Sequence, residues 1–341
     1  MPNDIVTNAP LEALSTFRLP ARAAELARLE DVAGLPDLLD TELPVLLLGG
    51  GSNTLFVDDF PGRIVVNRLR GIDSEVLDRD RVLVTAAAGE NWHELVRWTL
   101  DRGLWGLENL AMIPGLVGAA PMQNIGAYGV ELAHCLESVE VFDRRTGRSE
   151  RLAASECGLD YRDSRFKSAD RDRFVILGIR LELMMHGTPV LEYPSLLEEL
   201  ERHGHASPED PRTVAAAVMR VRKKKLPDPG LIANAGSFFK NPVVKNPVAQ
   251  DLVERNPDLP SWPDKPGCTK LSAGWLIDQL GWRGKSFGGA QVFDRHALVL
   301  INRGDATGQD VLRLAREIKA SVHERFGVEL EPEPLLVGGS V

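Results

Sequence analysis

The apolar positions of this chain gather in short runs that polar and turn-forming residues interrupt. Short aliphatic runs with such boundaries are typical of buried β-strands. The runs predict strands at residues 44–48, 64–66, 82–88, 174–179 and 296–301. Apolar and polar positions also alternate on both sides of Thr146 and Gly147, which predicts a β-hairpin over residues 138–152.

Helical spacing is clearest in two segments of the second half of the chain. In the first, apolar residues at positions 214, 218 and 221 recur once per turn, and Pro227 requires this helix to end before it. The second begins at Thr307, whose hydroxyl suits an N-cap, and ends at Gly327. Its apolar stripe consists of Val311, Leu314, Ile318, Val322 and Phe326. Because strands and helices follow one another without regular β–α–β alternation, we expect an α+β fold.

Length and composition narrow the class of protein. The 341 residues, 43% hydrophobic and 26% charged, suit two or three globular domains and neither a disordered nor a fibrous chain. Candidate boundaries lie near residue 70 and in the proline-rich stretch 226–229. No apolar run reaches the roughly 18 residues that a membrane span needs. The first ten residues lack the basic-then-apolar pattern of a secretory signal, so we expect a cytoplasmic protein.

The charge of the chain argues against anionic macromolecules as partners. With 40 basic and 49 acidic residues the formal charge is −9, which repels nucleic acid and anionic membranes. Any bound anion must therefore be held by local groups. The three cysteines, Cys135, Cys157 and Cys268, are far apart, and the histidines form no ligand set, His203 and His205 lying in a polar loop. The sequence therefore predicts no metal site.

Two glycine-rich stretches are the first candidates for a ligand site. Residues 49–53, Gly-Gly-Gly-Ser-Asn, follow the predicted strand 44–48 without the G-x-G-x-x-G spacing of a Rossmann site. They form either a cradle of backbone N–H groups for an anion or a tight turn that needs glycine for its conformation alone. Residues 103–129 contain six glycines among small apolar residues. Such a segment presents its backbone, which suits a flat ring and a pyrophosphate. A plain structural loop is the alternative, but loops of this length are usually functional.

Further segments carry polar side chains. Residues 220–225, Arg-Val-Arg-Lys-Lys-Lys, either complement a helix dipole in solvent or turn one lysine, Lys225, toward a diphosphate. Ser237, beside a glycine, is a turn-former or a proton donor, and the absence of a G-x-S-x-G elbow disfavours a hydrolase nucleophile. Arg162 beside Tyr161 suits bidentate binding of a carboxylate, and Glu333 lies in an extended segment after a helix.

Taken in their order along the chain, these segments resemble the UDP-N-acetylenolpyruvoylglucosamine reductase family. The resemblance runs from residues 15–17 to Glu333, nearly the whole chain. It rests on GGGSN, IPGLVG followed by QNIGAYG, YRDSRFK, NAGSFFKNP, AGWLIDQLGW and LEPE. Each motif alone is weak, whereas the series is highly specific. The family consists of bacterial flavoenzymes of peptidoglycan synthesis that reduce UDP-N-acetylglucosamine enolpyruvate to UDP-N-acetylmuramate.

The resemblance implies an α+β architecture: an FAD-binding fold of the vanillyl-alcohol-oxidase (PCMH) type with a third, substrate-binding α+β domain. It places FAD-binding subdomains at residues 1–70 and 71–221 and the substrate-binding domain at 222–333, with residues 334–341 returning to the first subdomain. FAD is expected to be non-covalent, because no histidine or cysteine precedes the glycine loop at a suitable spacing. NADPH is the implied co-substrate, and a monomer is the implied state.

The resemblance also implies roles for individual residues. Arg162 and Glu333 stabilise the enol-like intermediate that hydride addition produces, and Ser237 protonates it. The implied substrate contacts are Tyr193, which folds over the UDP moiety, Lys225 and Asn241. The implied FAD contacts are Gly49, Gly50, Gly51, Ser52, Asn53, Ile113, Pro114, Gly115, Gly118, Asn124, Gly126, Tyr128 and Gly129.

Some positions depart from the family pattern, and two other functions remain open. Ala119 and Ala120 stand where hydroxyl-bearing residues are expected, His296 where a glutamine can occur, and Pro334 where a valine is more usual. One alternative is a carbohydrate or alcohol oxidase on the same flavin fold, which lacks the pair of Ser237 and Glu333. The other is a non-catalytic sugar-nucleotide binder, which predicts no flavin.

Overall fold

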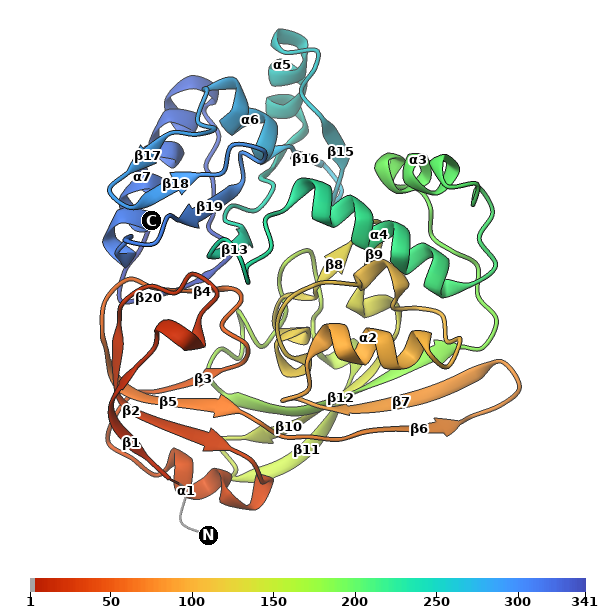
Figure 1. Ribbon diagram of the computed structural model, residues 1–341, viewed down its shortest axis with the longest axis vertical. Helices are drawn as coiled ribbons and strands as arrows, with labels where there is room; N and C mark the ends of the chain where they lie inside the picture. Colours follow the sequence, from red (N-terminus) through yellow and green to blue (C-terminus); the bar gives the residue numbers. More distant parts are fainter. Residues whose placement is uncertain (1–3) are drawn as a thin grey trace. The chain divides into compact units, whose positions relative to one another are not determined.

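The computed structural model describes residues 4–341, which divide into two compact units (Figure 1). The first unit contains residues 4–7, Glu25–Gly50 and Gly62–Lys224. The second contains Asn8–Ala24, Gly51–Pro61 and Lys225–Val341. The chain thus contributes three separate segments to each unit. The three-domain division expected from the sequence stays a prediction.

A five-stranded antiparallel sheet forms the centre of the first unit. Its strand order is β11 (Arg148–Ala153), β10 (Leu136–Asp143), β12 (Phe174–Met184), β7 (Arg81–Ala87) and β6 (Ile72–Val76). The helices of this unit with the longest apolar faces are α2 (Trp92–Leu100), α3 (Pro194–Arg202) and α4 (Pro211–Lys225). Figure 1 shows α2 and α4 on the same side of β7 and β12.

Residue alternation explains why the helices pack on one face of this sheet. Successive strand residues point to opposite faces, so Val82, Val84 and Ala86 of β7 enter the core shared with the three helices. Trp92, 1% exposed, anchors α2 in the same core, and its indole N–H donates to the Leu110 carbonyl at 3.0 Å. The opposite face of β7 carries Arg81, Leu83, Thr85 and Ala87.

Smaller elements complete the first part of the chain. A four-stranded sheet has the order β1 (Val6–Pro10), β2 (Arg22–Leu29), β5 (Phe60–Asn67) and β3 (Val45–Leu48), with β3 parallel to β5. The short helix α1 (Leu35–Leu39) buries Leu35 and Leu38 in the core next to this sheet. A two-stranded ribbon pairs β8 (Gly126–Ala127) with β9 (Val130–Glu131).

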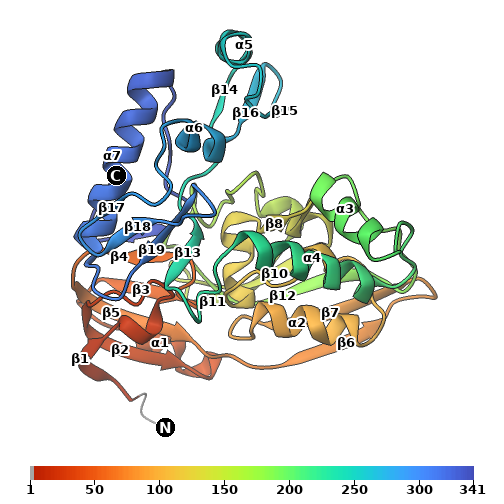
Figure 2. The same cartoon turned by 45° about the horizontal axis from the view of Figure 1, so that its top comes forward.

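The second unit is built on short sheets and one long helix. Its four-stranded sheet has the order β13 (Asn234–Ser237), β19 (Val299–Asn302), β18 (Ala290–Val292) and β17 (Ser286–Phe287). Helix α7 (Gly308–Phe326) lies beside β17 and β18 (Figure 2). The other elements are the sheet β14 (Val243–Lys245), β16 (Cys268–Leu271) and β15 (Ser261–Pro263), helices α5 (Asn246–Arg255) and α6 (Ala273–Gln279), and the parallel pair β20 (Leu335–Val337) and β4 (Thr54–Phe56).

Most elements predicted from the sequence pattern are confirmed, with one correction. The hairpin predicted over residues 138–152 is the β10–β11 pair, and Gly147 adopts φ 68° in its turn. At the start of α7, the Thr307 hydroxyl accepts from the Asp310 N–H, while the Asp310 carboxylate accepts from the Thr307 N–H. The strand predicted to start at residue 296 begins only at Val299, because the Val299 N–H closes a turn onto the His296 carbonyl at 3.1 Å. The α+β class is confirmed.

Within residues 4–341, none of the helices combines the length and the apolar character that crossing a bilayer requires.

Candidate active site

The two glycine-rich stretches meet in the first unit. A Cβ built on Gly50 would lie 3.0 Å from the Gly115 Cα, and one built on Gly49 would lie 3.5 Å from the Ala119 Cβ. The first distance is shorter than ordinary van der Waals contact, so a side chain at Gly50 would force the two loops apart. Gly50 and Pro114 are exposed, which leaves this backbone accessible to a ligand.

Backbone hydrogen bonds fix the second stretch against the end of β7 and the start of α2. The Val117 N–H donates to the Glu90 carbonyl at 2.9 Å, and the Gly118 N–H donates to the Ala88 carbonyl at 2.9 Å. A Cβ on Gly118 would lie 2.6 Å from the Ala88 Cβ, so glycine is required for this close approach. Gly115 therefore faces the Gly49–Gly50 turn from a fixed position.

These loops fit a flat, diphosphate-containing cofactor. The space that side chains at Gly49 and Gly50 would fill is bordered by the backbone of Gly115 and Leu116 and by the Cβ atoms of Leu116 and Ala119. Turns of this kind direct backbone N–H groups at anions without needing basic side chains. Ala119 is exposed beside Gly49, so the departure from a hydroxyl-bearing residue leaves a methyl group at this border. Ala120, 2% exposed, is part of the core instead.

The loop from Asn124 to Gly129 lies against Arg162. The Arg162 Nη2 donates to the Gly126 carbonyl at 3.0 Å, and the guanidinium lies 5.5 Å from the centre of the Tyr161 ring. The Arg162 backbone is in the left-handed region at φ 53°, which is uncommon for a side chain of this size. The fold therefore orients this guanidinium through both its backbone and its carbonyl contact.

Asn124 shapes the same loop. It is 1% exposed, with φ 42°. Its amide nitrogen donates to Glu131 Oε2 at 2.7 Å, and its amide oxygen accepts from the Ala133 N–H at 3.0 Å. These contacts show that Asn124 holds the loop in its strained conformation; its role as a cofactor contact stays a prediction.

Tyr128 and Tyr193 contact each other edge to face. Their ring centres are 5.1 Å apart at an interplanar angle of 75°. Burial raises the pKa of the Tyr128 hydroxyl to about 12, with Tyr193 adding to the shift and Arg222 opposing it. Tyr193 is 45% exposed and precedes the first turn of α3. The phenol of Tyr128 therefore stays protonated at neutral pH.

Four residues near these segments were not singled out from the sequence. His93 Nδ1 accepts from the Met112 N–H at 3.1 Å, directly before Ile113, and Glu108, 4% exposed, accepts from the Gly106 N–H at 2.7 Å. Asn109 is fully buried. Burial and Arg162 lower the pKa of Arg222, which places this guanidinium near Arg162 and Tyr128. Only Arg222 had a sequence signal, because it lies one turn before Lys225 in the basic run.

The second unit holds the rest of the first glycine stretch. Gly51 adopts φ 60°, and a Cβ there would lie 1.8 Å from the Leu14 carbonyl oxygen. Its own carbonyl accepts from the Thr16 N–H at 3.2 Å, and the Ser52 carbonyl accepts from the Thr16 hydroxyl at 3.5 Å. Gly51 therefore requires glycine for steric reasons, which is the tight-turn alternative, whereas the cradle role of Gly49 and Gly50 stays a prediction.

Ser237 and Glu333 lie on paired segments of the second unit. The Glu333 N–H donates to the Phe238 carbonyl at 2.8 Å, and the Lys240 N–H donates to the Glu331 carbonyl at 3.0 Å. Asn53 joins them, since its amide nitrogen donates to the Glu333 carbonyl at 3.2 Å. Ser237 and Glu333 are both half-buried. Two predicted catalytic residues thus lie on neighbouring, hydrogen-bonded segments, whereas the third, Arg162, belongs to the first unit.

The remaining substrate candidates are also in the second unit. Lys225 is exposed at the end of α4. The pKa of His296 is lowered first by its own burial and next by the positive charge of Lys225. His296 Nδ1 accepts from the Leu298 N–H at 3.3 Å, so this nitrogen is used inside the protein. Asn241 Oδ1 accepts from the Ala273 N–H at 3.0 Å at the start of α6, which leaves its amide nitrogen for other contacts.

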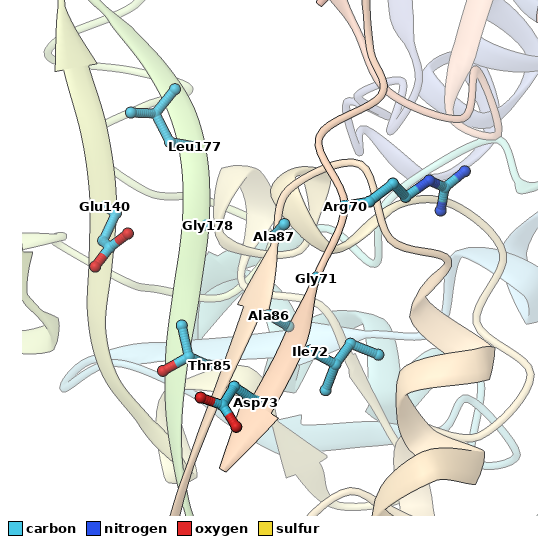
Figure 3. A pocket seen from close by; sticks show the side chains of 10 residues that line it. All are labelled: Arg70, Gly71, Ile72, Asp73, Thr85, Ala86, Ala87, Glu140, Leu177 and Gly178. Carbon is cyan, nitrogen blue, oxygen red and sulfur yellow. The ribbon is translucent and has the colours of Figure 1, made fainter. Parts of the chain in front are cut away.

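A separate pocket of about 320 Å³ lies on the sheet of the first unit (Figure 3). It opens on the face of β6, β7, β10 and β12 opposite the helices, and its lining contains none of the predicted site residues. Two of its charged groups are paired: Arg70 with Glu90 at 3.1 Å and Glu140 with Arg151 at 2.8 Å. The lining residues are Arg70, Gly71, Ile72, Asp73, Thr85, Ala86, Ala87, Glu140, Leu177 and Gly178.

Comparison with known proteins agrees with this geometry. A family model described as an FAD binding domain matches residues 20–153, which include the cradle, so the fold and the site define an FAD-binding protein. A second model, the C-terminal domain of UDP-N-acetylenolpyruvoylglucosamine reductase, matches residues 228–337. This second match contains both Ser237 and Glu333.

Whole-chain comparisons extend the match. The UDP-N-acetylenolpyruvoylglucosamine reductase of Burkholderia multivorans is 48% identical over 337 residues, covering 97% of this chain and 96% of the relative. That of Paraburkholderia xenovorans is 48% identical over 331 residues, covering 96% of each chain. The crystal structure of the Thermus caldophilus enzyme superposes with a TM-score of 0.67 at 29% identity, covering 98% of this chain and 99% of that one.

The chain belongs to the UDP-N-acetylenolpyruvoylglucosamine reductase family. It is an FAD-containing oxidoreductase, and the FAD-binding fold expected from the sequence is confirmed.

Proposed function

We propose that this enzyme reduces UDP-N-acetylglucosamine enolpyruvate to UDP-N-acetylmuramate with NADPH as the reductant, in bacterial peptidoglycan synthesis. The observation that carries the proposal is the pairing of the Ser237 and Glu333 segments in the second unit. A proton donor and a carboxyl on neighbouring segments suit the reduction of an enol ether, because negative charge develops on one carbon and a proton must be added to that carbon.

The cofactor is assigned to the backbone of the first unit. Gly49, Gly50 and the Ile113–Gly118 segment hold the diphosphate and ring of FAD, with Gly126 and Gly129 beside the ring. When bound, FAD supplies the redox chemistry, taking reducing equivalents from NADPH and delivering them to the enolpyruvyl group. The protein contributes position, because Gly115 and Gly118 are fixed by the bonds to the β7–α2 turn.

Three side chains handle charge and proton on the substrate. Arg162 binds the enolpyruvyl carboxylate, and Glu333 in its protonated form donates a hydrogen bond to it. Together they stabilise the negative charge that develops there when C3 accepts a hydride. Arg162 is held for this task by the Gly126 carbonyl, at a backbone conformation that costs energy. Ser237 gives its hydroxyl proton to C2, which is possible because the enol-like intermediate is a much stronger base than water.

The sugar nucleotide is held by local groups despite the acidic protein. Lys225 binds the diphosphate as a point charge, Asn241 donates to the substrate through its amide nitrogen, and Tyr193 covers the UDP moiety. NADPH and a UDP-sugar are both cytoplasmic metabolites, so we place the reaction in the cytoplasm, and we propose that the enzyme acts as a monomer.

The proposal is tested by an anaerobic two-step titration followed by visible absorbance. NADPH is added to the FAD-loaded protein, and UDP-N-acetylglucosamine enolpyruvate is then added in one equivalent. We expect the flavin absorbance to bleach in the first step and to return in the second. A flavin that returns only when oxygen is admitted would show an oxidase, and a protein that never takes up FAD would refute both functions.

The proton-donor role of Ser237 gives a prediction for a single substitution. Ser237→Ala should leave flavin reduction by NADPH unchanged and slow reoxidation by the sugar nucleotide by about 10²- to 10⁴-fold, the usual contribution of a positioned acid. Stopped-flow absorbance measures both half-reactions. The matched control is Ser272→Ala, which removes the N-cap of α6 in the same unit and should lower stability without slowing reoxidation. Equal reoxidation rates in Ser237→Ala and wild type would exclude Ser237 as the acid.

A further inference from the structure

Strand β13, which carries Ser237, pairs irregularly with its neighbour β19. Asn234 lies opposite Ile301, and Ser237 lies opposite Val299. Two residues of β13 therefore lie between these pairs where β19 has only one, which is the arrangement of a β-bulge. The proton donor of the proposed function thus follows directly after a bulge in its own strand.

The bulge decides which face of the sheet Ser237 lies on. Successive residues of a regular strand point to opposite faces, so residues three positions apart point to opposite sides. Opposed residues of an antiparallel pair share a face. Val299 and Ile301 are buried in one small cluster with Phe293, so Asn234 and Ser237 share that face. With Asn234 in place and no bulge, Ser237 would point to the other face, where α7 packs.

The neighbouring residues show where the change of face takes place. Ala235 and Phe238 are also three positions apart, yet both belong to the core that contains Leu300 of β19 and Val311 of α7. They therefore share the face opposite to that of the proton donor. The alternation is broken once between them, at Gly236.

The side chain of Asn234 holds the bulge in place. It is 1% exposed, and its Oδ1 accepts from the Gly236 N–H at 2.8 Å. Its amide nitrogen donates to the Ile232 carbonyl at 2.7 Å and to the Pro227 carbonyl at 3.4 Å. This buried amide therefore joins the bulge to the segment that precedes β13.

Gly236 supplies the backbone conformation that the bulge needs. Its φ is 71°, in the left-handed region that glycine adopts without the steric penalty of other residues. A Cβ built there would meet nothing within 4 Å among residues 4–341. Glycine is therefore needed for its φ angle alone, and the bond from its N–H to Asn234 fixes that conformation.

We propose that Asn234 and Gly236 are positioning residues for the proton donor: the bulge that they form holds the Ser237 hydroxyl in the direction from which it protonates the substrate. This inference rests on the proposed function, which assigns Ser237 as the acid. Bulges beside active sites redirect side chains in this way. Because proton transfer needs a well-aligned donor, a displacement of about 1 Å is enough to slow it. In this role both residues act through Ser237.

The direct test is Asn234→Ala, which removes the acceptor of the Gly236 N–H. In stopped-flow absorbance we expect unchanged flavin reduction by NADPH and a limiting rate of reoxidation by UDP-N-acetylglucosamine enolpyruvate that is lower by about tenfold. The concentration of sugar nucleotide that gives half of this rate should change less than about twofold, because an interaction of the transition state is lost. Asn234→Ser, whose hydroxyl can accept from the same N–H, should restore part of the rate. Unchanged reoxidation in folded, FAD-loaded Asn234→Ala would overturn the proposal.

A double-mutant cycle separates positioning from general destabilisation. In a Ser237→Ala background, Asn234→Ala should slow reoxidation no further, because the residue through which it acts has lost its hydroxyl. A further loss of about tenfold would contradict the proposal.

The matched control is Asn302→Ala on the neighbouring strand β19. Asn302 is 7% exposed, and its side chain donates to the Phe17 and Arg18 carbonyls and accepts from two N–H groups outside β13. Its loss should lower stability and leave reoxidation as in wild type. Equal slowing in Asn302→Ala and Asn234→Ala would show a general effect on the sheet and overturn the proposal.

A second variant keeps the test decisive where Asn234→Ala does not fold. Gly236→Ala adds a methyl group in open space and strains φ, so it should slow reoxidation by about threefold, again only when Ser237 is present. Its control is Gly267→Ala in the turn before β16, where φ is 79° and a Cβ also meets nothing within 4 Å among the described residues. Equal reoxidation rates in these two glycine variants would count against the proposal.

Hydrogen exchange separates this inference from the proposed function. In the FAD-loaded enzyme without substrate, Asn234→Ala should speed exchange of the Gly236 amide hydrogen, and Asn302→Ala should not. If exchange speeds up but the wild-type enzyme does not reoxidise with the sugar nucleotide, the proposed function fails and the role of Asn234 in holding the bulge stands. If exchange is unchanged while wild type turns over, the positioning role fails alone.

Discussion

At the scale of single residues, backbone strain is concentrated where the site is assembled. Non-glycine residues with positive φ include Met112, Asn124, Tyr128 and Arg162, all on the segments that form the first unit's part of the site. Such conformations persist only when surrounding contacts enforce them, and here those contacts are visible in the bonds of His93, Asn124 and Arg162. Side-chain direction at this site is therefore set by main-chain geometry as much as by rotamers.

Gly51 and Gly147 allow two reasons for glycine to be compared: the lack of space for a Cβ atom and the positive φ angle. Both have φ between 60° and 68°, but a Cβ at Gly51 meets the Leu14 carbonyl at 1.8 Å, whereas one at Gly147 meets nothing within 4 Å. Gly147→Ala should lower the free energy of unfolding by about 1–2 kcal/mol, the strain of a left-handed alanine. Gly51→Ala should lower it by more than about 3 kcal/mol, because backbone must also move. Urea denaturation measures both, and equal losses would refute the steric argument.

At the scale of elements, the loop that forms the cofactor cradle is held by neighbouring secondary structure. The turn between β7 and α2 binds the backbone of Val117 and Gly118. Helix α2 holds the start of the loop, because His93 accepts from the Met112 N–H. The shape of the loop therefore depends on α2 as well as on the hydrogen bonds of its own turns. A change in α2 should therefore alter the cofactor site without touching a cofactor contact.

The contribution of His93 to the stability of the fold depends on pH. Burial, aided by Arg97, Arg222 and Lys223 and opposed by Glu94, lowers its pKa below the ordinary 6.5. The unfolded chain then binds the proton more readily, so the contribution of His93 to stability is complete above pH 6.5 and is lost as the pH falls through its folded-state pKa. Its Nδ1 acceptor, which the Met112 N–H needs, is lost on protonation of that nitrogen.

The measurement is the free energy of unfolding in urea between about pH 5.5 and 7.5. His93→Asn keeps an acceptor near the position of Nδ1 and cannot titrate. We expect the decline of stability toward acidic pH to be shallower in His93→Asn than in wild type, with FAD retained. Parallel curves would show that His93 does not titrate differently on folding.

At the scale of the whole molecule, an acidic chain binds a cofactor and a substrate that both carry diphosphates. The formal charge of −9 works against such ligands at long range, so binding depends on main-chain N–H groups and on a few cations. In the proposed assignment, the two glycine stretches supply the N–H groups, and Arg162 and Lys225 supply the cations. The net charge of the molecule does not attract these diphosphate ligands.

Removal of FAD should therefore show how much of the fold depends on its ligand. A ligand that binds only the folded state stabilises it by about 2.7 kcal/mol at a hundred times its Kd. We expect the FAD-free enzyme to melt at a lower temperature and the loss to be restored by FAD but not by riboflavin, which lacks the diphosphate assigned to the glycine cradle. Calorimetry measures this, and equal rescue by riboflavin would place the binding energy in the ring alone.

Several features of this protein follow from local sequence. The β10–β11 hairpin and the capped helix α7 depend on residues close together in the chain, and both were predicted from pattern alone. The residue types of the site, and through the order of their motifs the family, were also readable from the sequence. Short-range patterns carry this information because periodicity, capping and turn chemistry act over a few residues.

Other features were decided only by tertiary structure. The bond between Asn53 and Glu333 joins residues 280 positions apart, and the contact of Asn109 with Val190 joins residues 81 positions apart. Nothing in the local pattern marks Asn109, His93 or Glu108, because a buried polar side chain acquires its role from the carbonyl or N–H groups that distant segments bring to it. Strand 296–301 was predicted too long for the same reason. Its first residues are apolar enough for a strand, but the backbone turns to bring Val299 into the sheet.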